Sequence, residues 1–78
     1  MARSPKSVQI QAEMVANVMT VYVAPGDRVR TGDTVALLES MKMEIPVLSE
    51  HEGTVIVVNA HPGDNVQEGD ALVTVELA

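Results

Sequence analysis

The chain has 78 residues and a formal net charge of −6; 46% of its residues are hydrophobic, yet Tyr22 is the only Phe, Tyr or Trp. This length allows one domain with a modest core, and the lack of cysteine excludes disulfides and thiolate metal sites. Few basic and aromatic side chains disfavour nucleic-acid binding, and no apolar run is long enough to span a membrane, so we expect a single cytoplasmic domain.

Residues 1–7 are expected to form a flexible tail ahead of a domain over residues 8–78. Fourteen valines favour strands, because branching at Cβ suits a pleated sheet and crowds a helix. Two very short strands are expected near Val29 and Val66. Apolar or alternating runs between turn residues predict six longer strands, at 8–12, 18–23, 34–40, 43–48, 55–60 and 71–77. Eight short strands with regular turns predict an all-β fold, a small sandwich or flattened barrel.

The chain contains two copies of one pattern at a constant offset of 37 residues. The Pro, Gly, Asp, Val, Gly and Asp of residues 25–33 recur at the matching positions of residues 62–70. Because two copies are too few for a solenoid, we expect two interlocked halves related by an approximate two-fold axis.

Each copy begins with a Pro-Gly-Asp turn, in which Pro presets φ and Gly accepts a positive φ, as in a type II turn. A Gly-Asp pair a few residues later marks a second turn. The repeated aspartates are explained as turn formers more simply than as acid/base pairs. The predicted structural turn positions are Pro25, Gly26, Gly32, Gly53, Pro62, Gly63 and Gly69.

Lys42 is the only basic residue of the second half of the chain, and it lies between the two copies. If Met41 and Lys42 form a two-residue hairpin turn, both need a positive φ, for which Asn-Gly or Asp-Gly is usual. An exposed lysine beside methionines is most often an ordinary surface feature. The central position and the missing turn residues favour a functional site here, because departures from local rules concentrate at such sites.

The segment from Glu39 to Glu44, with both Pro-Gly-Asp turns, resembles biotin carboxyl carrier proteins over residues 8–77. The resemblance implies a barrel-sandwich hybrid of two four-stranded antiparallel sheets, with biotin covalently attached to Lys42. It also implies that Glu39, Met41 and Met43 form part of the surface read by a biotin protein ligase. In that family the carrier is not an enzyme; it moves carboxyl groups between biotin carboxylase and carboxyltransferase partners.

Two positions depart from the family pattern. Ser40 stands where many members have Ala, and Ala16 stands where many have a Gly equivalent to Gly53. At position 40 one small residue replaces another, whereas at position 16 a residue with a Cβ replaces glycine and affects the local backbone.

A lipoyl carrier is the alternative reading, because lipoyl domains resemble this chain in fold and repeat but commonly have Asp-Lys-Ala at the hairpin. An unmodified β interaction domain is the third. The sequence shows no nucleophile paired with an acid or base partner, so nothing in it indicates an enzyme. His51 and His61 are isolated and lack the spacing of metal ligands, so no metal site is expected.

Overall fold

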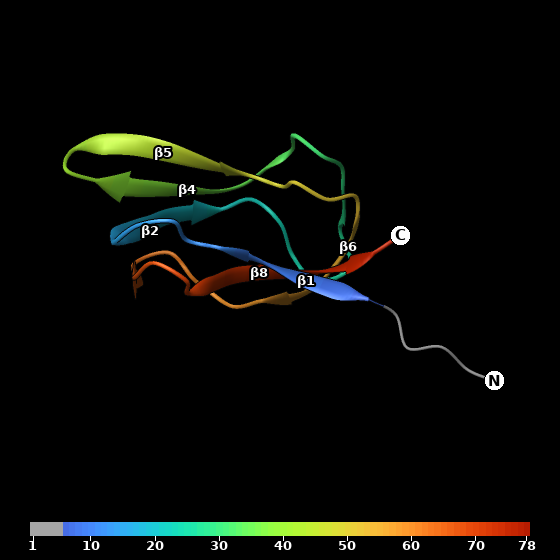
Figure 1. Ribbon diagram of the computed structural model, residues 1–78. Helices are drawn as coiled ribbons and strands as arrows, with labels where there is room; N and C mark the ends of the chain where they lie inside the picture. The colour runs from blue at the N-terminus through green and yellow to red at the C-terminus, as the bar shows by residue number, and fades with distance from the viewer. Residues whose placement is uncertain (1–5) are drawn as a thin grey trace.

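The computed structural model describes residues 6–78, which form eight strands and no helix (Figure 1). Residues 1–5 of the predicted tail lie outside the described residues, whereas Ser7, also predicted as tail, is the first strand residue and pairs with Glu76. Two antiparallel four-stranded sheets have the strand orders β1-β8-β6-β3 and β5-β4-β2-β7, which is the predicted all-β architecture. No helix able to cross a membrane occurs among residues 6–78. The strands are β1 (Ser7–Gln11), β2 (Ala16–Val21), β3 (Arg28–Val29), β4 (Thr34–Ser40), β5 (Met43–Leu48), β6 (Gly53–Val58), β7 (Asn65–Val66) and β8 (Ala71–Leu77).

The 37-residue repeat is also a repeat of structure. Strands β1–β4 come from the first copy and β5–β8 from the second, and each sheet takes two strands from each copy. The irregularities repeat as well: Met19 in β2 and Ile56 in β6 are the unpaired residues of equivalent bulges. The two copies therefore interlock, and neither has a complete sheet of its own.

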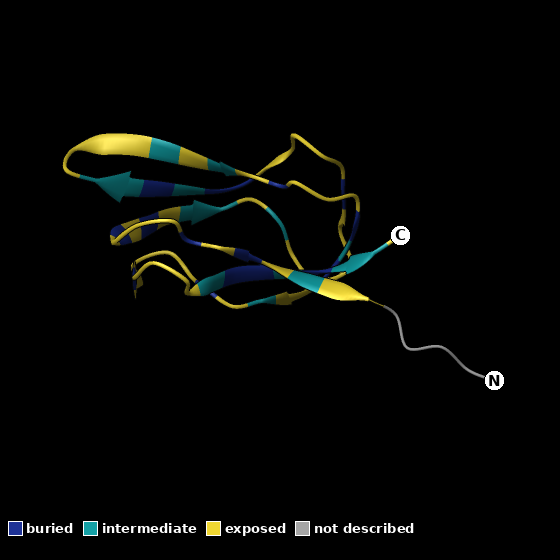
Figure 2. Cartoon of the chain, viewed as in Figure 1, coloured by how far each residue is buried: buried dark blue, intermediate teal, exposed yellow. Residues whose placement is uncertain are grey.

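The core between the sheets is aliphatic, and its side chains come from the inner faces of the strands (Figure 2). Val35, Val55, Val73 and Val75 have no exposed surface, and Leu38 is 1% exposed. Complete burial of a Val or Leu side chain contributes about 1.5–3 kcal/mol. This packing supplies the stability that a chain of 78 residues without cysteine cannot take from disulfides.

Four turns share one geometry. Their glycines have φ between 91° and 97°, and the residue after each glycine donates its N–H to the carbonyl three residues earlier. This is the pattern of a type II turn. In each turn the Asp carboxylate accepts the backbone N–H of the first residue at 2.8–2.9 Å. The four glycines are Gly26, Gly32, Gly63 and Gly69.

Gly53 differs from its prediction as a turn residue, because it is the first residue of β6 and is absent from the positive-φ glycines. A Cβ at Gly53 would collide with the backbone carbonyl oxygen of Glu76 in β8. Glycine is therefore needed here because β6 and β8 approach each other closely. Strands β2 and β6 also begin and end two residues earlier than predicted, since Ala16 and Gly53 pair with the short strands β7 and β3.

Strands β1 and β5 are outer strands of the two sheets, and β5 contains a proline. Pro46 lies opposite Leu37 of β4. Counted from the Ser40–Met43 pair that closes the hairpin, alternate pairs exchange backbone hydrogen bonds, and the Leu37–Pro46 pair falls among those that do not. The ring nitrogen of Pro46 thus faces away from β4, where no ladder bond is lost.

Candidate functional site

The β4–β5 hairpin turns at Met41 and Lys42, and both residues are left-handed, with φ of 51° and 65°. Two successive positive φ values define the type I′ turn that a two-residue hairpin requires. A residue with a side chain in this region is disfavoured by roughly 1–2 kcal/mol, which Asn or Gly would largely avoid. The hairpin therefore keeps a strained backbone in order to carry Met and Lys at its tip.

The tip is open to solvent. Met41 is 93% exposed and Met43 66%, and Lys42 is exposed between them (Figure 2). Within residues 6–78 the Lys42 side chain has no salt-bridge or hydrogen-bond partner. The hairpin projects from the opposite end of the molecule to the C-terminus and β1 (Figure 1). An ammonium group placed in this way is free for an incoming partner to handle.

Two acidic residues lie directly opposite each other just behind the tip. Glu39 of β4 and Glu44 of β5 are register partners, so their side chains lie on the same face of the hairpin. Like charges at such positions disfavour the pairing. The pair places two negative charges close to the single positive charge of Lys42.

The loop between β1 and β2 supports the hairpin. The hydroxyl of Ser40 donates a hydrogen bond of 3.1 Å to the backbone carbonyl of Val15, in the loop between β1 and β2. Val15 is 69% exposed and the preceding Met14 is 39% exposed. The hydrogen bond thus places a loop with two exposed apolar side chains next to the last residue of β4. No local sequence pattern indicates this contact, because the two segments are 25 residues apart.

The histidines lie away from the hairpin. His61 sits in a turn, where its Nδ1 is 3.9 Å from the carboxylate of Asp64, and both side chains are exposed. His51 follows the buried Ser49, whose hydroxyl donates to the His51 carbonyl. No group of three potential metal ligands occurs in the described part of the chain.

Comparison with known proteins identifies the family. The model of the biotin/lipoyl attachment family, described as "Biotin-requiring enzyme", matches residues 7–76. The chain belongs to this family. A domain of this family carries a cofactor and is not itself the catalyst.

Relatives and solved structures agree with the assignment. The biotinylated protein TB7.3 homolog of Mycolicibacterium smegmatis is 60% identical over 40 residues, which are 51% of this chain and 56% of that protein. The match thus spans about half the length of this curated relative. Kluyveromyces lactis urea carboxylase superposes with a TM-score of 0.84 at 27% identity, over 96% of this chain and 7% of that one. The lipoyl domain of the Azotobacter vinelandii 2-oxoglutarate dehydrogenase complex gives a TM-score of 0.67 at 26% identity, over 78% and 77%.

The residues of the hairpin tip fit a cofactor that is joined through an amide. Both biotin and lipoate carry a carboxyl group that can acylate a primary amine, and Lys42 offers one in the exposed turn of the hairpin. The flanking Met41 and Met43 leave the amine accessible, because their own side chains extend into solvent. The tip can therefore hold the group and present it, and a partner must supply the chemistry.

Proposed function

We propose that this chain is a biotin carboxyl carrier domain and that biotin is attached to Nζ of Lys42. The observation that carries the proposal is the strained, exposed turn in which Lys42 stands between Met41 and Met43. Among the relatives, the TB7.3 homolog is named as biotinylated. The lysine between two methionines, without the Asp-Lys-Ala common in lipoyl domains, favours biotin over lipoate.

Attachment needs an activated biotin, which a biotin protein ligase would provide as biotinyl-adenylate. The unprotonated Nζ of Lys42 attacks the acyl carbon, so that an amide C–N bond forms and the acyl–phosphate bond breaks, releasing AMP. The ligase accepts the proton lost from the amine. The contribution of this chain is to hold the amine on a rigid hairpin.

Glu39, Met41 and Met43 form the surface that the ligase would read. Met41 and Met43 are exposed apolar side chains on either side of the target, and flexible thioethers adapt well to a partner surface. Glu39 adds a charge that can be paired across the interface. Together they make the hairpin recognisable and distinguish Lys42 from an ordinary surface lysine.

Once biotinylated, the domain would carry carboxyl groups between a biotin carboxylase and a carboxyltransferase in the cytoplasm. The exposed tip lets the arm enter a partner site while the rest of the domain stays outside (Figure 1). A covalent tether also keeps the carried group at a high effective concentration near both sites. Urea carboxylase, which this fold matches, is an enzyme named for a carboxylation.

Intact-mass measurement after co-expression with an active biotin ligase tests the proposal. The wild type should gain the mass of one biotinyl group. Lys42→Arg should gain none, whereas Lys6→Arg, which alters the only other lysine, should be modified like the wild type. A wild-type chain without an adduct overturns the proposal. A lipoyl adduct, in cells that also contain a lipoyl ligase, would identify a lipoyl carrier instead.

A further inference from the structure

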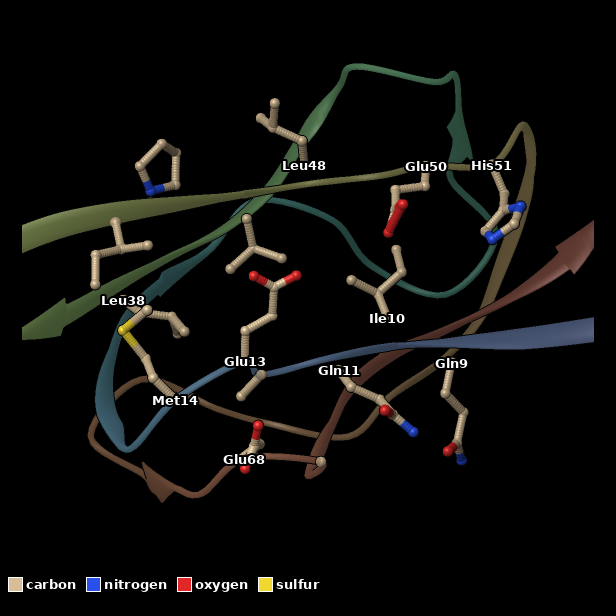
Figure 3. Close-up of a pocket in the computed structure, with 15 residues that line it drawn as sticks. Gln9, Ile10, Gln11, Glu13, Met14, Leu38, Leu48, Glu50, His51 and Glu68 are labelled. Atoms are coloured by element: carbon tan, nitrogen blue, oxygen red, sulfur yellow. The ribbon is translucent and has the colours of Figure 1, made fainter.

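A groove of about 780 Å³ opens between the two sheets, on the side where the outer strands β1 and β5 face each other (Figure 3). Met14 and Leu38 lie at the end of the groove nearer the hairpin. Glu50 and His51 lie at the end nearer the C-terminus, and Glu13 points into the groove from the β1–β2 loop (Figure 3).

The two-fold repeat makes the ends of this groove equivalent in backbone but not in chemistry. An offset of 37 converts Met14 into His51 and Glu13 into Glu50, and all four residues line the groove. The end towards the hairpin therefore has a thioether where the other end has an imidazole. Of the two equivalent positions, only the one near the hairpin thus offers an apolar side chain to the groove.

The apolar end lies within reach of a group on Lys42. Its walls include Leu38 and Ile45, and Ile45 is three residues along β5 from Lys42, about 10 Å at the usual rise of a strand. A biotinylated lysine extends on the order of 15 Å from Cα to the ring system. The length of the arm therefore allows the ring to reach Ile45 at this end of the groove.

The hydrogen bond between Ser40 and Val15 holds this end of the groove in place. It ties the β1–β2 loop to the last residue of β4, and Met14 is the neighbour of Val15 in that loop. The backbone of the loop that bears Met14 is therefore held next to the hairpin that bears Lys42.

We propose that the hairpin end of this groove is a resting site for the biotinyl group on Lys42, an inference that rests on the proposed function. The apolar face of the fused rings packs on Met14 and Ile45, above Leu38 at the buried floor. The ureido N–H groups donate to the carboxylate of Glu13, which points into the groove beside these residues (Figure 3). The contact is small and solvent-accessible, so the arm leaves it readily when a partner site is offered.

NMR of the biotinylated domain, labelled in its Met and Ile methyl groups, tests the contact. Biotinylation should shift the Met14 and Ile45 signals and give NOEs from the ring protons to the Met14 methyl. Ile56, an exposed residue of the β6 bulge, serves as the control and should not shift. Changes confined to Met41 and Met43 would show a freely extended arm and overturn the resting site.

Streptavidin capture gives an independent readout, because it requires the arm to be undocked. For biotinylated Met14→Gln we expect capture about threefold faster than for the wild type, in proportion to the larger undocked fraction. The matched variant His51→Gln, at the equivalent position, should behave like the wild type. Equal rates for all three proteins would contradict the proposal. Intact mass separates the two hypotheses: without an adduct on Lys42 the proposed function fails, whereas an adduct without groove contacts rejects only the resting site.

Discussion

Ser40 and Val15 are joined by a hydrogen bond of 3.1 Å at the place where the two halves of the fold cease to match. In the second half the equivalent carbonyl, that of Glu52, accepts the backbone N–H of Ala78 at 3.2 Å. The residue equivalent to Ala78 is Met41, where the chain turns into the hairpin. The hydroxyl of Ser40 supplies the donor that the backbone no longer offers.

Ala16 explains why the hydroxyl of Ser40, and not a backbone N–H, donates to the carbonyl of Val15. In the second half Gly53 pairs with Leu77, whereas the β2–β4 ladder includes no pair between Ala16 and Ser40 and begins one residue later. A Cβ at Gly53 would strike the neighbouring strand, and the Cβ of Ala16 accounts for the missing pair at the equivalent point. The two departures from the family pattern, at positions 16 and 40, are therefore a single structural feature.

Ser40→Ala should lower the free energy of unfolding by about 0.5–1 kcal/mol, the usual range for an exposed hydrogen bond. The loss should be smaller in an Ala16→Gly background, because the ladder can then extend by one pair. Urea denaturation of the four proteins in a double-mutant cycle measures this coupling. Ser7→Ala is the control, since the Ser7 hydroxyl makes no hydrogen bond within the described residues. Equal losses of unfolding free energy in the wild-type and Ala16→Gly backgrounds would show that positions 16 and 40 act independently.

Gly53→Ala should destabilise the fold by about 2–3 kcal/mol, because the added Cβ meets the backbone of β8, which cannot move aside without breaking the ladder. The reverse exchange at the equivalent position, Ala16→Gly, should cost only about 0.5–1 kcal/mol, through backbone entropy. Urea denaturation compares the two directly. A small effect at Gly53 would show that β6 and β8 can separate there.

Met41→Asn should raise the free energy of unfolding by about 0.5–1 kcal/mol, since Asn tolerates the left-handed conformation better than Met. The same variant should be biotinylated more slowly by the ligase, because an exposed apolar contact is removed. Thermal or urea unfolding gives the first quantity and a time course of intact mass the second. Increased stability with unchanged biotinylation would remove Met41 from the recognition surface.

Glu44→Gln should stabilise the hairpin by about 0.2–1 kcal/mol, because it relieves the like charges opposite each other at Glu39 and Glu44. Both side chains are partly or fully exposed, so added salt should shrink the gain. Unfolding in urea at low and high ionic strength checks both statements. A gain that is independent of salt would assign the effect to packing.

Periodicity and turn residues were enough to predict the eight strands, the repeat and a hairpin at Met41 and Lys42, because each is a local pattern. They misplaced β2 and β6 by two residues, since the start of each strand is set by the approach of another strand. The same limit explains why the local pattern predicts a turn at Gly53, which is the first residue of β6. The groove and the bond between Ser40 and Val15 join distant segments, and no local pattern encodes such a contact.

Pro46 has a consequence for how the domain meets its partners. An outer strand normally offers a row of N–H and carbonyl groups to any other strand, and identical carriers at high concentration could then pair edge to edge. The proline interrupts that row halfway along β5, only a few residues from the hairpin. A partner protein is then less able to add a strand to β5 and must rely more on side-chain contacts there. Contacts of this kind dissociate readily, which suits a carrier domain that has to leave one partner protein before it can bind the next.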